Sequence, residues 1–122
     1  MENNVVPVYT SRGDAVAFLQ YPYLHNRAGE WIGFVNAQRE VYSVLGYYVG
    51  VLTNDPRIIR LRSEEFKSRI KPPAAPAHIR IAAVIPLARL MSDLSHQHID
   101  VLMDEPELLH TLDAGDLRQD LD

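Results

Sequence analysis

The sequence contains no cysteine. Without thiols the chain can form no disulfide framework, no Cys-ligated zinc site and no catalytic thiolate, and this composition suits a reducing cytoplasm. The N-terminus has neither the basic nor the apolar region of a secretion signal, and no apolar run is long enough to cross a bilayer. We therefore expect a cytoplasmic protein with no membrane partner.

Familiar catalytic motifs are missing as well. The chain has no Gly-x-Ser-x-Gly, no phosphate-binding Gly-Lys-Ser/Thr loop and no His-Glu-x-x-His. Glu30 and Glu40 are the right residue type for paired hydrolase carboxylates, but both stand beside predicted turns, where glutamates are usually solvated. The sequence therefore favours a protein that is not an enzyme, and we predict no cofactor.

Charge is scarce overall and unevenly placed. The 122 residues are 47% hydrophobic and 23% charged with a net charge of −4, which is typical of one globular domain. Residues 1–71 carry nine basic and seven acidic side chains, whereas residues 72–122 carry three and nine. The basic excess is concentrated in one stretch, and its members are Arg57, Arg60, Arg62, Lys67, Arg69 and Lys71.

Such a stretch could bind nucleic acid, because neutralised phosphates release counterions. The alternative is that it is solvated or meets the acidic C-terminal part. We favour the alternative, since nucleic-acid surfaces are normally strongly basic and this chain is acidic overall.

The clearest feature that is present is a short pattern repeated three times. Each copy has an apolar residue, Tyr or His, three variable residues, Gly, two variable residues, Val or Ile, a small residue, and two apolar residues. The offsets of 16 and 17 residues suit a two-stranded hairpin and are too short for a βαβ unit. The copies span residues 8–19, 24–35 and 41–52, with their glycines at Gly13, Gly29 and Gly46.

One position inside the repeat is always small, and it holds Ala17, Gly33 and Gly50. Because glycine weakens a strand interior, its recurrence implies that a backbone or a bulky side chain such as Trp31 approaches closely there. We favour this packing interpretation. The alternative is a ligand held against bare backbone at a pseudosymmetric centre.

Residues 57–62 predict a seventh strand without a glycine turn after it, so the fourth copy is only half present. Residues 63–71 could form one or two helical turns. An extended, proline-containing arm at residues 72–86 is too apolar to be left in water, and its second half could add an eighth strand. Helical spacing of leucines predicts an acidic helical tail at residues 87–122.

The histidines near the C-terminus invite a metal-binding interpretation. On a helix His96 and Asp100 would share a face, and His and carboxylate groups suit zinc. That spacing is more often a surface hydrogen bond, so we predict no metal site.

The three glycine-centred hairpins, the half repeat at residues 57–62 and the following Pro-rich stretch together resemble the four-fold β-flower proteins. These are small bacterial proteins without an assigned activity, so the resemblance implies a fold and no catalytic residues. The phrase from Gly29 to Val35 is also similar to PRC-barrel domains, whose members include RNA-processing proteins. Three evenly spaced copies favour the flower.

We therefore expect a mainly β fold of antiparallel hairpins with pseudosymmetry, seven or eight strands in all, followed by the arm and a short α-helical tail. The boundaries would fall at residues 1–71, 72–86 and 87–122. Whether residues 78–85 or the N-terminus completes the fourth repeat stays open.

The expected function is a non-enzymatic, self-associating interaction or scaffold module, because the arm carries more apolar surface than a small monomer readily exposes. The partner would be a second copy, or another protein that binds the Pro-rich arm. Two alternatives are an RNA- or DNA-binding module of PRC-barrel type using residues 57–71, and a small-ligand binder or enzyme at the pseudosymmetric centre.

Overall fold

A computed structural model describes residues 4–64 and 67–113 of the chain. These residues form one eight-stranded antiparallel sheet in which each strand pairs with its neighbours in sequence order. The predicted hairpins are β1 (Val6–Tyr9) with β2 (Ala15–Gln20), β3 (Tyr23–His25) with β4 (Trp31–Val35), and β5 (Glu40–Ser43) with β6 (Tyr48–Leu52). A fourth hairpin joins β7 (Ile58–Leu61) to β8 (His98–Asp100).

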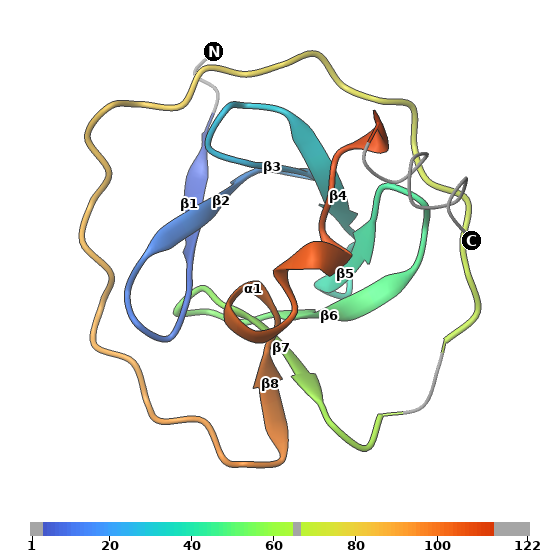
Figure 1. Ribbon diagram of the computed structural model, residues 1–122. Helices are drawn as coiled ribbons and strands as arrows, with labels where there is room; N and C mark the ends of the chain where they lie inside the picture. The colour runs from blue at the N-terminus through green and yellow to red at the C-terminus, as the bar shows by residue number, and fades with distance from the viewer. Residues whose placement is uncertain (1–3, 65–66, 114–122) are drawn as a thin grey trace.

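The hairpins stand around a centre that is occupied by α1 (Val101–Asp104) and the 3-10 helix η1 (Pro106–Leu108), as Figure 1 shows. Residues 62–64 and 67–97, called the strap from here on, run around the outside of the hairpins and return the chain to β8 (Figure 1). The mainly β fold with a short C-terminal helix is therefore confirmed. One continuous core lies at the centre, where residues of all four hairpins pack against Val101, Leu102 and Leu109.

The internal repeat is also a repeat of register. The buried residue that begins each copy lies opposite the small residue near its end, in the pairs Val8–Ala17, Leu24–Gly33 and Val41–Gly50. In all three hairpins the register shifts directly after this pair. Equivalent sequence therefore produces equivalent β-structure three times.

Five turns between consecutive strands, three inside the glycine hairpins and two between hairpins, share a second pattern that sequence reasoning did not recognise. In each, a side-chain oxygen at the first position accepts the amide of the fifth, as Asn26 does from Glu30. Asn36 does the same for Glu40, although the glycine position there holds Arg39 with a φ of 66°. The five turns are residues 10–14, 26–30, 36–40, 43–47 and 53–57.

The prediction for the second half of the chain was wrong in two respects. The eighth strand is His98–Asp100, so neither residues 78–85 nor the N-terminus completes the fourth repeat. Residues 87–94, predicted as helix, have no regular secondary structure, and the described part of residues 63–71 contains no helix.

Length explains the second error. An extended chain rises about 3.1 Å per residue and a helix only about 1.5 Å, so a helical strap would be too short to encircle the hairpins. A helical turn does begin at Pro106, as predicted, and the acidic segment 114–122 lies outside the described residues.

Candidate functional site

The pseudosymmetric centre is filled by the protein's own side chains. A Cβ atom added to Gly33 would lie 2.6 Å from the carbonyl oxygen of Tyr42 and 2.9 Å from Cδ2 of Leu109. A Cβ atom added to Gly50 would lie 2.8 Å from the carbonyl oxygen of Ile59. Neighbouring backbone and a core leucine thus occupy the space that a ligand would need, while Ala17 is fully buried in the same core.

Trp31 lies in a separate cluster between the second and third hairpins. Its indole Nε1 donates to the carbonyl oxygen of Gly33 at 2.7 Å, and Tyr23 meets its ring edge-on. Phe34 and Tyr42 stack with their ring centroids 5.5 Å apart in the same cluster. These aromatic rings pack against one another and do not form a stacking surface for bases.

The basic stretch is largely used inside the molecule. Arg57 is only 3% exposed, Arg60 forms a 2.6 Å ion pair with Glu105, and Lys67 forms a 2.8 Å ion pair with Glu40. Arg62 donates to the carbonyl oxygen of His96, Arg69 donates to that of Leu45, and Lys71 is exposed. The six side chains considered as a nucleic-acid site therefore come from Arg57, β7 and the strap, and mostly bind the protein itself.

Lys67 belongs to a clasp that holds the start of the strap on the third hairpin. Its hydrogen bond to Glu40, with one from Asn36, holds the pKa of Glu40 below its ordinary value. The ammonium group also lies 4.6 Å from the centroid of the Tyr48 ring. Burial, together with the nearby carboxylate of Glu64, raises the pKa of Tyr48, whose hydroxyl donates to that carboxylate. The clasp is thus an ion pair set against an aromatic face.

His96 and Asp100 do not share a helix. His96 is exposed just before β8, whereas Asp100 is 1% exposed, ends β8 and caps α1 through the amide of Met103. Among residues 4–64 and 67–113 no three His, Asp or Glu side chains are grouped so that they could hold a metal ion. Glu30 and Glu40, the other carboxylates considered, each accept a hydrogen bond from the Asn of their own turn.

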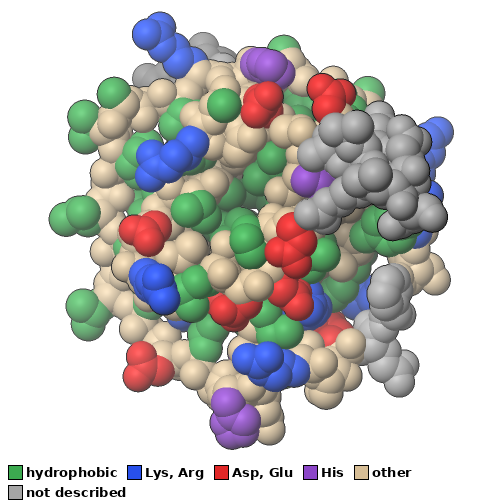
Figure 2. All heavy atoms as spheres, in the orientation of Figure 1, with side chains coloured by type: hydrophobic (Ala, Val, Ile, Leu, Met, Phe, Trp, Pro, Cys, Tyr) green, Lys and Arg blue, Asp and Glu red, His purple; other side chains and the backbone are tan. Residues whose placement is uncertain are grey.

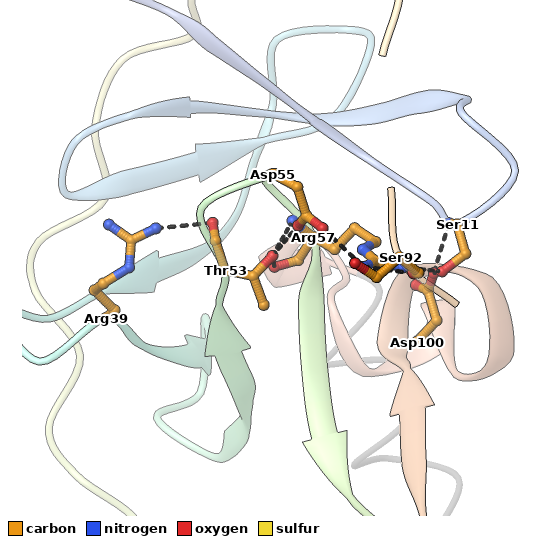
Figure 3. A network of polar contacts seen from close by, with 7 residues as sticks. All are labelled: Ser11, Arg39, Thr53, Asp55, Arg57, Ser92 and Asp100. Carbon is orange, nitrogen blue, oxygen red and sulfur yellow. Dashed lines mark hydrogen bonds and ion pairs between the residues drawn. The ribbon is translucent and has the colours of Figure 1, made fainter. Parts of the chain in front are cut away.

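A partly buried polar network joins the fourth hairpin to the first, and we call it the seam (Figure 3). Oδ2 of Asp100 accepts from both the amide and the hydroxyl of Ser11, at 2.6 Å each. Arg57 donates to the hydroxyl of Ser11, to the carboxylate of Asp55 and to the carbonyl oxygen of Ser92. The seam thus links both ends of the sheet to the strap. Its residues are Ser11, Asp55, Arg57, Ser92 and Asp100.

Electrostatics favour the ionised form of one seam residue, Asp55. Burial raises the pKa of Asp55, but hydrogen bonds from Arg57 and Thr53 outweigh it and hold that pKa below its ordinary value. A cavity of about 270 Å³ adjoins the seam and is lined by Arg62, His96 and His98 as well as seam residues. Sequence reasoning did not find this network, because Ser11 and Asp100 lie far apart in the chain and belong to no motif.

The strap touches the hairpins at regular intervals. The amide of Ile70 donates to the carbonyl oxygen of Gly46 at 3.0 Å, and nine residues later the amide of Ile79 donates to that of Gly29, also at 3.0 Å. After nine more residues, the Cβ atom of Ala88 lies beside Gly13. The strap therefore meets the glycine turns of the three hairpins in reverse order.

Burial along the strap has a shorter period, that of a polyproline II helix with three residues per turn. From residue 73 to residue 94 the partly buried residues fall mainly at every third position. Those on this period are Pro73, Pro76, Ile79, Ile85, Ala88, Met91 and Leu94, and Ile81 is partly buried off the period. Several of these cover the first hairpin, where they pack against Tyr9 and Phe18.

A row of large apolar side chains faces outward on the same period. Val84, Leu87 and Leu90 are 85%, 93% and 104% exposed, and we call them the outer row. Figure 2 shows hydrophobic side chains standing out along the left rim, where the ribbon in Figure 1 places this part of the strap. No helix among the described residues is both long and apolar enough to span a membrane.

A family model described as the 4-fold beta flower protein matches residues 6–87. The chain belongs to this family. No curated protein and no solved structure matches this chain. The β-flower match covers the three glycine hairpins, β7 and most of the strap, and it ends before β8 and α1. The resemblance noted in the sequence is thereby confirmed for the fold.

Proposed function

We propose that this β-flower is a non-enzymatic scaffold module that self-associates through the outer row. The observation that carries the proposal is the near-complete exposure of three large apolar side chains placed three residues apart. Exposed apolar side chains that line up contiguously mark interaction surfaces far more often than scattered ones do.

The architecture around the row supports a scaffold. The inward residues Ile85, Ala88 and Met91 pack on the first hairpin, so the backbone that carries the row is held in place. A pre-ordered surface loses less conformational entropy on binding than a mobile loop does. The centre is filled, with Leu109 against Gly33, so a partner would bind the outer surface that the strap forms.

A second copy is the partner that the charges favour. Arg80 precedes the outer row and Asp93 follows it, and both side chains are exposed. Two copies related by a two-fold axis near Leu87 would run antiparallel and turn unlike charges toward each other at both ends of the row. Two-fold homodimers are the commonest oligomers, and such complementarity orients the encounter.

The proposal is tested by light scattering over a range of protein concentrations. We expect the mass to rise from one copy to two, and the double variant Leu87→Asp, Leu90→Asp to remain a monomer with an unchanged fold by circular dichroism. Tyr21→Asp is the matched control, because Tyr21 is 62% exposed but lies outside the strap.

A wild-type protein that stays monomeric at high micromolar concentration would overturn the proposal. Loss of association in Tyr21→Asp equal to that in the double variant would also contradict it.

A further inference from the structure

The second hairpin and the strap share one carbonyl group. The oxygen of Gly29 accepts the amide of Ile79 at 3.0 Å and lies 3.3 Å from Nδ1 of His25. Because a carbonyl oxygen only accepts, Nδ1 carries the proton and Nε2 of the neutral ring is a bare lone pair. The contact is tight, since a Cβ atom on Gly29 would lie 1.8 Å from the carbonyl oxygen of Ile79.

His25 is fully buried, and its Nε2 has no hydrogen-bond partner among the residues that the structure describes. Burial lowers the pKa of His25, the hydrogen bond to Gly29 partly offsets this, and nearby His78 on the strap lowers it further. A proton on Nε2 would create a buried cation whose new N–H has no acceptor, which is among the costlier states in a protein interior.

The other two glycine hairpins lack this feature. At the position of His25 they carry Tyr9, whose hydroxyl donates to the carbonyl oxygen of Pro86, and Tyr42, whose hydroxyl donates to Glu40. A tyrosine hydroxyl ordinarily titrates at about pH 10, whereas an ordinary histidine titrates between about pH 5 and pH 8. The third hairpin therefore has the same backbone contact, between Ile70 and Gly46, but a tyrosine stands where the second hairpin has His25.

Few charges face His25 from the elements around it. Phe18 on β2 and Trp31 on β4 are its register partners and are uncharged. The charged or titratable neighbours lie on its own turn and on the strap beside Ile79, and they are Arg27, Glu30, His78 and Arg80. The carboxylate of Glu30 is held by Asn26, and no carboxylate contacts the ring to stabilise a cation there.

We infer that the strap is an acid-sensitive latch that opens at Ile79 when His25 takes up a proton. The proton comes from solvent and binds Nε2, and the cation becomes stable only when water reaches the ring. The strap is the element that can move, because one backbone hydrogen bond, from Ile79 to Gly29, holds it at the second hairpin, whereas β2 and β4 are paired along their length.

The test is amide hydrogen exchange measured by NMR from about pH 7.5 to about pH 5.5, with each rate corrected for its intrinsic pH dependence. If only the open state binds the proton, with an ordinary histidine pKa, the opening constant at Ile79 rises about tenfold over this range. The amide of Ile70 serves as the internal control and should stay flat. Equal rises at both amides, or no rise at Ile79, would overturn the latch.

Two variants separate the histidines. His25→Tyr installs the residue that the first and third hairpins use, and it should abolish the rise at Ile79; His25→Phe serves if the tyrosine variant does not fold. His78→Asn should keep most of the rise. A rise that persists without His25, or that disappears only when His78 is replaced, would contradict the assignment. The measurement is made on a dilute sample, so it does not depend on self-association.

Discussion

The first three hairpins and the fourth occupy equivalent places in the flower but are formed differently. In the first three, a glycine turn joins two strands that are adjacent in sequence, and the buried residue always faces a small one, as Leu24 faces Gly33. In the fourth, β7 and β8 are separated by the whole strap. Local sequence therefore builds three hairpins, while the last depends on long-range contacts.

What replaces the glycine turn in the fourth hairpin is a set of charged hydrogen bonds. Asp100 binds Ser11 of the first hairpin, Arg57 binds Ser11 and Ser92, and Arg60 binds Glu105 just after α1. Asp100 and Arg57 are buried and Arg60 is half-buried, so leaving any of these three charged groups unpaired is expensive. Polar contacts therefore close the flower at the fourth hairpin, whereas apolar packing forms the three repeated hairpins.

The largest expected effect is on the seam. Arg57→Ala removes the donor to Ser11, Asp55 and Ser92 at a site that is 3% exposed, and it should cost about 3–5 kcal/mol of unfolding free energy. Urea denaturation measures this, with Arg62→Ala as the exposed control, expected to change stability by about 0.5 kcal/mol or less. Equal costs for the two variants would show that the seam does not close the flower.

A somewhat smaller effect is expected at the centre. Leu109 is 7% exposed and contacts the backbone of β4 at Gly33, so Leu109→Ala should cost about 3 kcal/mol through lost burial and a residual cavity. Leu112→Ala, at a position that is 39% exposed, is the matched control. If denaturation curves of the two variants coincide, the C-terminal segment is not part of the shared core.

A third comparison sharpens the role of the strap. Gly13 and Gly29 have φ angles of 90° and 80°, so alanine strains the backbone similarly at both. Only Gly29 is closely covered, because a Cβ atom there would meet Ile79 at 1.8 Å, whereas at Gly13 the nearest atom is 3.7 Å away. We expect Gly29→Ala to cost about 2 kcal/mol more than Gly13→Ala in thermal denaturation. Equal costs would mean that the strap does not dock at Gly29.

The smallest expected effect concerns the clasp. The pKa of Glu40 is lowered chiefly by Lys67, so its contribution to stability is present above the ordinary glutamate pKa and is lost as the pH falls through the lowered value. Glu40→Gln should therefore melt below the wild type at about pH 7, and the two should converge in acid. Melting temperatures that differ by the same amount at all pH values would exclude the ion pair as the cause.

The sequence was sufficient for the parts that repeat. Three aligned glycines and the small residues Gly33 and Gly50 predicted the hairpins and their close packing, because the same local sequence pattern recurs in three copies. The turn at Asn36 was missed, since Arg39 adopts the positive φ that glycine takes elsewhere.

The sequence was insufficient for the parts that occur once. Leu87 and Leu90 have a spacing that suits a helix. An extended strap with three residues per turn also buries side chains periodically. Only the distance that the segment must span decides between the two conformations. No local sequence pattern predicts that Asp100 will bind Ser11 or that His98–Asp100 will pair with β7. The seam and the latch at His25 are contacts between distant segments, so no single motif encodes them.

The account depends most on the identity of the strand that completes the fourth hairpin, and cross-strand nuclear Overhauser effects test it directly. In a uniformly labelled sample we predict contacts between the backbones of Arg60 and Ile99 and of Ile59 and Asp100, the register pairs of β7 and β8. Contacts from residues 58–61 to residues 78–85 or to the N-terminal residues, in place of residues 98–100, would contradict it.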